Sequence, residues 1–189
     1  MDSALIISCA KKNIAFFAEM LSAASIGSIL TLSSCAEARR LLLERDFDLV
    51  IIDAPLRDET GESLARHITS KGIAQVILAV SSEHFDAVSN TCEKYGVLPI
   101  SKPINKTVFW SALNLARAAH SRLARIRSEN SKLKQKIEEI RIVDRAKCIL
   151  ISNLNMSEQE AHRHIEKQAM DMRTTRRVIA EGILKTYEN

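Results

Sequence analysis

Two residues that could do chemistry, an aspartate and a lysine, each follow an apolar run of this 189-residue chain. Asp53 comes directly after residues 49–52, and Lys102 follows a short run at residues 97–100. A carboxylate can act as a nucleophile, and an ammonium group can pair with a nearby negative charge. Because the carboxyl ends of parallel strands meet at one edge of a sheet, we expect the two side chains to lie close together. The alternative is a structural ion pair that fastens the two strand ends.

The segments around these residues alternate between strand and helix patterns. Residues 4–7, 49–52 and 76–80 are continuous aliphatic runs, as expected of strands buried on both faces of a parallel sheet. Helical patterns cover residues 13–24, 36–44 and 61–70, and weaker strands are predicted near residues 29–32 and 97–100. This alternation predicts a doubly wound α/β domain with a parallel five-stranded sheet over residues 1–115.

The strand-ending Asp53 and the later Lys102-Pro103 pair resemble the phosphoacceptor and the phosphate-pairing lysine of response-regulator receiver domains. The resemblance implies that Asp53 accepts a phosphoryl group from a histidine kinase. It also implies a Ser or Thr that contacts the phosphate after the fourth strand. That position is Ser81 when counted from Gly96 and Val80 when counted back from Lys102.

An important departure concerns the acidic pair that holds Mg²⁺ in receivers, because Ser8 and Cys9 stand in its place. A hard cation prefers carboxylate oxygens, and phosphoryl transfer needs its charge. We therefore expect a degenerate receiver that has lost its Mg²⁺ site and holds no cofactor, with Asp53 in a structural ion pair. Asp58 and Glu59, in the loop after Asp53, are an alternative source of metal oxygens.

Residues 116–143 carry a heptad pattern that predicts a coiled-coil connector. The expected a and d positions are Leu123, Ile126, Asn130, Leu133, Ile137 and Ile140. A polar residue at an a position pairs best with its own copy in a parallel two-stranded coil, so Asn130 favours a homodimer. The alternative is that this stripe packs on the chain's own domains.

The C-terminal part is basic. Residues 116–189 hold 16 Lys and Arg against 10 Asp and Glu, whereas residues 1–115 hold 11 against 13. Residues 144–189 have the pattern of three short helices, with a capping box at Ser157 and Glu160 and with Thr174 or Thr175 as the cap of the third. Helices this short must pack on one another to be stable. The pattern predicts a small helical bundle with a polyanionic partner.

Several short groups of residues in this bundle resemble, in order and spacing, the ANTAR domain, an RNA-binding module of bacterial transcription antiterminators. The matching groups are Ala146-Lys147, Ile149-Leu150, Ser157-Glu158, Glu160-Ala161, Ala169-Met170-Asp171, Arg173, Ile179-Ala180 and Ile183-Leu184. Arg176 departs from the pattern, because the family usually has an apolar residue there. The resemblance implies that residues 144–189 bind hairpins in nascent leader RNA and prevent a terminator from forming.

Such binding needs cations that contact backbone phosphates. The candidates are Arg145, Lys147, Arg163, Lys167, Arg173, Arg176 and Arg177. For each of them the alternative is an ordinary solvated position on a helix. His162 and His164 are not expected to bind a metal, because residues two apart point to different sides of a helix.

Together these patterns predict a dimeric antitermination regulator that is not an enzyme and that answers to a sensor kinase or another regulatory protein. No apolar run approaches the roughly 20 residues of a membrane span, and four scattered cysteines indicate reduced thiols, so a cytoplasmic location is expected. One alternative is a DNA-binding response regulator with a C-terminal helix-turn-helix, for which residues 173–177 are the nearest approach to a recognition helix. Another is a pure interaction protein whose tail only dimerises, although the basic excess counts against it.

Overall fold

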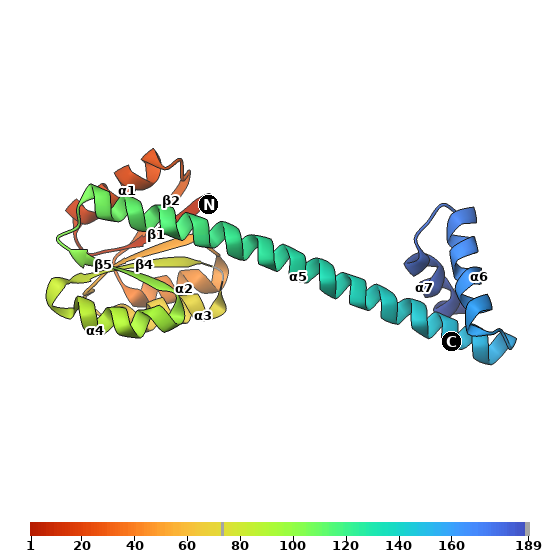
Figure 1. The fold of residues 1–189 in the computed structure, drawn as a ribbon. Helices are drawn as coiled ribbons and strands as arrows, with labels where there is room; N and C mark the ends of the chain where they lie inside the picture. The colour runs from red at the N-terminus through yellow and green to blue at the C-terminus, as the bar shows by residue number, and fades with distance from the viewer. Residues whose placement is uncertain (73, 188–189) are drawn as a thin grey trace. The chain divides into compact units, whose positions relative to one another are not determined.

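The structure is a computed structural model that describes residues 1–72 and 74–187. It divides into two compact units, Met1–Ala124 and Arg125–Asn189, each with its own core (Figure 1). The 49-residue helix α5, Lys106–Leu154, contributes residues to both units.

The N-terminal unit contains a parallel five-stranded sheet with the order β2-β1-β3-β4-β5. The strands are β1 (Ser3–Ile7), β2 (Ser28–Leu32), β3 (Leu49–Asp53), β4 (Gln75–Ser81) and β5 (Val97–Lys102). The helices that connect them are α1 (Lys11–Ala23), α2 (Cys35–Glu44), α3 (Glu62–Lys71) and α4 (Ser82–Cys92), with a 3₁₀ turn at Glu93–Tyr95. The predicted doubly wound fold is confirmed.

Two apolar cores lie on opposite faces of this sheet, because successive side chains of a strand point to opposite sides. Phe17 of α1 and Phe109 of α5 pack on one face together with Ile51 of β3. Leu64 of α3 and Val88 of α4 pack on the other face, where α2 also lies. Figure 1 shows α1 and α5 on one side of the strands and α2, α3 and α4 on the other. Burial on both faces explains the uninterrupted aliphatic runs in the sequence.

Local features fix the ends of several helices in this unit. Ser34 caps α2, since its side chain accepts a hydrogen bond from the Glu37 backbone N–H at 3.2 Å. Gly61 precedes α3 with φ +84, and a Cβ at this position would lie 2.7 Å from Cγ2 of Ile52. A side chain at residue 61 would therefore be strained by its backbone conformation and would collide with β3.

Helix α4 was not among the helices predicted from the sequence. It begins at Ser82, directly after β4 ends at Ser81, so no turn residues mark its start. Its segment is rich in Ser, Asn and Thr, and Val88 and Cys92 are its only buried residues. The short apolar stripe of Phe85, Val88 and Cys92 is what holds the helix on the sheet.

The C-terminal unit is a three-helix bundle of the last part of α5 with α6 (Glu158–Asp171) and α7 (Arg176–Tyr187). Its buried core is built from small and aliphatic side chains of all three helices.

 This core is made up of Ala146, Leu150, Ala161, Ile165, Ala169, Ile179, Ala180 and Ile183. The predicted capping box is confirmed, because the Ser157 Oγ accepts from the Glu160 N–H at 3.3 Å and the Glu160 Oε2 accepts from the Ser157 N–H at 2.8 Å.

Local features mark the ends of these helices. Helix α5 continues to Leu154, and the next residue, Asn155, has φ 52. Of the two predicted caps of α7, Thr175 has this role, since its Oγ1 accepts from the Val178 N–H at 3.4 Å. Arg176 is half exposed at the start of α7, which explains how a charged residue is tolerated where the resemblance expects an apolar one.

Candidate functional sites

Asp53 and Lys102 are brought together at the carboxyl edge of the sheet, as expected from the strand order. Lys102 Nζ lies 2.5 Å from Asp53 Oδ1 and also donates to the carbonyl oxygen of Ala54. The second carboxylate oxygen, Oδ2, accepts from Ser8 Oγ at 2.6 Å and from Asn13 Nδ2 at 2.8 Å. Asp53 is only 4% exposed, so this ring of donors replaces the water that its charge would otherwise need.

Asn13 is the member of this cluster that sequence reasoning missed. It lies in the first turn of α1, and its amide reaches a carboxylate 40 residues further along the chain. The available signal was its position: it follows β1 closely, and the first turn of the next helix lies at the same edge of the sheet as the end of β3.

The donors at this site do not fit a Mg²⁺ ion. Ser8 supplies a hydroxyl that already donates to Asp53, and Cys9 Sγ contacts the Ser33 carbonyl oxygen at 3.1 Å. Among the described residues that contact one another at this site, Asp53 is the only carboxylate. Mg²⁺ prefers several oxygen ligands and keeps several of its waters, so one carboxylate is a poor site for it. The loss of the metal site stays a prediction, and the donor set supports it.

The alternative metal ligands in the following loop are engaged elsewhere. Asp58 accepts hydrogen bonds from the Cys35 N–H at 3.2 Å and from the Ala36 N–H at 2.9 Å. The pKa of Asp58 lies below its ordinary value, chiefly because of the hydrogen bond from Ala36. Glu59 forms an ion pair with Arg39 at 2.7 Å. Cys35 lies beside both acids, but burial and their charges raise the pKa of its thiol to about 12, which keeps it protonated.

Ser81 ends β4 level with Lys102, because the strand register pairs these two residues. Its Oγ lies 2.8 Å from Nδ1 of His84 in the first turn of α4. Val80, the other candidate for the switch position, is 4% exposed and packs in the core on the α3 and α4 side. Ser81 is thus the residue that carries a hydroxyl at the end of this strand.

The predicted a and d side chains of the connector form an exposed apolar stripe on α5. Leu123 and Ile126 are 41% and 39% exposed, and the later members, Leu133, Ile137 and Ile140, are 57%, 52% and 59% exposed. Asn130 lies on the same stripe, and its Nδ2 donates to the Ile126 carbonyl oxygen at 3.1 Å. We call this set of six residues the seam.

Arg176, Arg177 and Lys147, which are among the predicted RNA-binding cations, form ion pairs with acids of the same unit. Arg176 Nη1 lies 3.3 Å from Glu166 Oε1, and Arg177 Nε donates to Glu181 Oε1 at 2.8 Å. The third cation, Lys147, contacts acids on two helices.

Lys147, another of the predicted RNA-binding cations, is largely covered by its contacts. Its side chain is only 16% exposed, because Nζ lies 2.8 Å from Asp144 and 3.4 Å from Glu158. The pKa of Lys147 is raised, chiefly by its hydrogen bond to Asp144. Lys147 therefore joins α5 to the start of α6. These ion pairs favour a structural role for Lys147 over the predicted contact with RNA, and the salt dependence of RNA binding by a Lys147 variant separates the two.

The remaining cations lie on the outside of the bundle. Arg163, Lys167 and Arg173 are exposed, and in the described part of the chain no hydrogen bond or ion pair engages the side chain of Lys167 or Arg173. Arg163 and Lys167 are one turn apart on α6, so they lie on the same side of that helix. Arg145 is also exposed and takes part in an interaction of its own.

The fold of the N-terminal unit defines the class of protein, since a parallel sheet in the order β2-β1-β3-β4-β5 with a carboxylate at the end of β3 is the receiver arrangement. A receiver domain protein from Clostridium thermocellum matches with a TM-score of 0.57 and 21% identity over 65% of this chain and 99% of that chain. A CheY-like receiver domain from Methylobacillus flagellatus matches with a TM-score of 0.52 and 21% identity over 61% of this chain and 98% of that chain.

The C-terminal part identifies the family. The family model described as the ANTAR domain matches residues 131–184. The transcriptional regulatory protein PdtaR of Mycobacterium tuberculosis is 30% identical over 139 residues, which cover 74% of this chain and 68% of that protein. The chain belongs to the ANTAR-domain response regulators, which are in general regulators and not enzymes. None of the helices in the described part of the chain is long and apolar enough to span a bilayer.

Proposed function

We propose that this protein is a transcription antiterminator that binds hairpins in nascent leader RNA through residues 144–189. The observation that carries the proposal is the ANTAR match over residues 131–184. The exposed cations on α6 and in the turn after it support the match, because they have the charge that binding to phosphates requires. PdtaR, a transcriptional regulatory protein by name, is consistent with a role at the level of transcription.

The receiver-like domain controls this binding, in our proposal, without a covalent mark. Asp53 is already neutralised by Lys102 and hydrogen-bonded by Ser8 and Asn13, and among the described residues these contacts include no second carboxylate for Mg²⁺. A sensor kinase or another regulatory protein would then act by binding one of two conformations of the chain more tightly than the other. Such a partner shifts the equilibrium by its difference in affinity alone.

The proposed active form is a parallel homodimer held by the seam. Five large apolar side chains on this stripe are exposed in the single chain, and a second copy would remove them from water. Asn130 would meet its own copy at the centre of the coil and fix the register of the two helices. The dimer would act in the cytoplasm, where the nascent transcript is found.

The test is a binding titration of the full-length protein against a two-hairpin leader RNA and against duplex DNA of the same sequence. We expect the RNA to bind more tightly, with an affinity that falls steeply as salt rises, because the contacts release phosphate counterions. Tighter binding to the duplex DNA would contradict the proposal and favour the helix-turn-helix alternative.

A further inference from the structure

A groove between α6 and α7 has features of a site for one flat, polar ligand group. It has a volume of about 610 Å³, within the range of about 300–1,000 Å³ that is typical of ligand pockets. We call it the α6–α7 groove. It is lined by Glu139, Glu166, Ala169, Met170, Arg173, Thr174, Thr175 and Arg176, all from the C-terminal unit.

The turn after α6 shapes this groove. Thr174 N–H donates to the Ala169 carbonyl oxygen at 2.9 Å, and Arg173, with φ 49, donates its N–H to the Met170 carbonyl oxygen at 3.1 Å. Ala169 is a small residue that belongs to the bundle core, whereas Met170 beside it is 72% exposed. The short side chain of Ala169 beside the long side chain of Met170 leaves a hollow with an apolar wall.

The polar groups of the groove carry both charges. Arg173 supplies an exposed guanidinium group at its rim. Glu166 contacts its neighbours through Oε1, which lies 3.3 Å from Arg176 Nη1 and 3.3 Å from His162 Nε2. In the described part of the chain this leaves Oε2 of Glu166 without a hydrogen-bond partner, so one carboxylate oxygen of this lining residue remains able to accept from a ligand.

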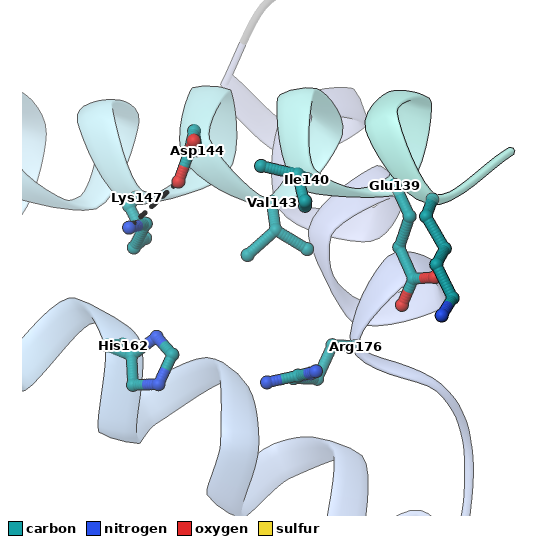
Figure 2. A pocket seen from close by; sticks show the side chains of 8 residues that line it. Glu139, Ile140, Val143, Asp144, Lys147, His162 and Arg176 are labelled. Carbon is teal, nitrogen blue, oxygen red and sulfur yellow. Dashed lines mark ion pairs between the residues drawn. The ribbon is translucent and has the colours of Figure 1, made fainter. Parts of the chain in front are cut away.

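A neighbouring groove shows which of the two would stay open in a dimer. It is lined from α5 by Ile140 of the seam and by Asp144 and Lys147, the next a and d positions, and these face His162 and Arg176 (Figure 2). A second α5 helix that follows the seam would run along this neighbouring groove. The α6–α7 groove receives only Glu139 from α5, at a c position off the seam, and so remains accessible.

We propose that the α6–α7 groove receives one unpaired base from the loop of an RNA hairpin, and that it selects a base with an exocyclic amino group. The proposal rests on the proposed RNA binding and adds its site of sequence recognition. Met170 stacks on the face of the base, Arg173 pairs with a flanking phosphate, and Glu166 accepts a hydrogen bond from the amino group.

The carboxylate is the reason that the choice of base is specific. Adenine, cytosine and guanine each present an amino donor, and a carboxylate is an acceptor only. Uracil has a single N–H between two carbonyl oxygens, which would face the negative charge of Glu166. The methionine takes the place of the aromatic rings that RNA-binding proteins commonly use, since Tyr187 is the one aromatic residue of residues 144–189.

The experiment selects RNA with the full-length protein from a pool of hairpins that share one stem and have a randomised loop. For the wild type we expect one loop position from which uracil is depleted. Met170→Ala should lower the affinity for the selected hairpin about 5-fold, because the contact of the methionine sulfur with the base is lost. Glu166→Gln should restore uracil at that position, because an amide can donate to a carbonyl oxygen whereas a carboxylate cannot.

The matched control is Met172→Ala, since Met172 is 69% exposed but does not line the groove. We expect it to bind the selected hairpin like the wild type, and circular dichroism should show equal helicity for all variants. Equal affinity of Met170→Ala and Met172→Ala, with the loop preference retained in both, would overturn the proposed base site while leaving RNA binding in place. No binding of any hairpin by the wild type would overturn the proposed function itself.

Discussion

The carboxyl edge of the sheet and the outward side of α6 both carry charged side chains, but only the first set is neutralised within the chain. Asp53 is buried and contacts Ser8, Asn13 and Lys102, whereas Lys167 is exposed and has no such partner in the described residues. A buried charge must be paired where it stands, while an exposed charge can remain for a partner. The comparison separates groups that hold the fold from groups that are available to a ligand.

The largest effect should come from breaking the buried ion pair. Lys102→Met leaves the carboxylate of Asp53 buried without its cation, and we expect a loss of roughly 3 kcal/mol in the free energy of unfolding. Chemical denaturation measures this loss. The double variant Asp53→Asn with Lys102→Met should recover most of it, because no charge then remains buried. A loss below about 1 kcal/mol in the single variant would show that Asp53 is held mainly by its neutral donors.

The second prediction concerns the chemistry of the same edge. Acetyl phosphate with Mg²⁺ should label the wild-type protein poorly, since the site has one carboxylate where the cation needs more. The variant Ser8→Asp with Cys9→Asp should gain the label, and adding Asp53→Asn should remove it. Intact-protein mass reports each result. A clear phosphoryl adduct on the wild type that Asp53→Asn abolishes would contradict the structural role given to Asp53.

The third prediction compares two lysines of the bundle. Lys167→Ala should weaken RNA binding and lower the slope of log affinity against log salt by about 1, because one phosphate contact is lost. Lys147→Ala should leave that slope nearly unchanged and lower the thermal stability, because Lys147 joins Asp144 to Glu158. The opposite pattern, with Lys147 controlling the slope, would mean that its ion pairs open when RNA binds.

The smallest effect is expected at the seam. Asn130→Leu should stabilise the dimer modestly, by about 1 kcal/mol, and reduce its preference for two strands, because a buried amide exchanges stability for specificity. Sedimentation equilibrium measures both quantities. A wild-type protein that is monomeric at micromolar concentration would rule out the coiled coil.

Much of this architecture follows from patterns that are local in the sequence. The aliphatic runs predict the strands, the order of the strands brings Asp53 to Lys102, and the capping box at Ser157 predicts the start of α6. Each of these depends on residues a few positions apart or on a general rule of sheet topology.

The features that were missed depend on distances between elements that no local pattern contains. Asn13 reaches Asp53 only because α1 begins beside the end of β3, and Lys147 is covered only because Glu158 comes back to it across the turn between α5 and α6. Helix α4 was missed for a different reason, since few of its residues are apolar. Periodicity detects a face of an element, but it does not say which polar group another element will bring to it.

If the proposed dimer forms, the exposed stripe on α5 makes the amount of this protein a variable in its own control. In that dimer two copies meet to cover the side chains from Leu123 to Ile140, so the paired fraction would follow the law of mass action. At low abundance the chains would be mostly single, and pairing would rise more steeply than in proportion to the number of chains synthesised. Expression level would then act as a threshold on antitermination, separately from any signal received by the receiver-like domain.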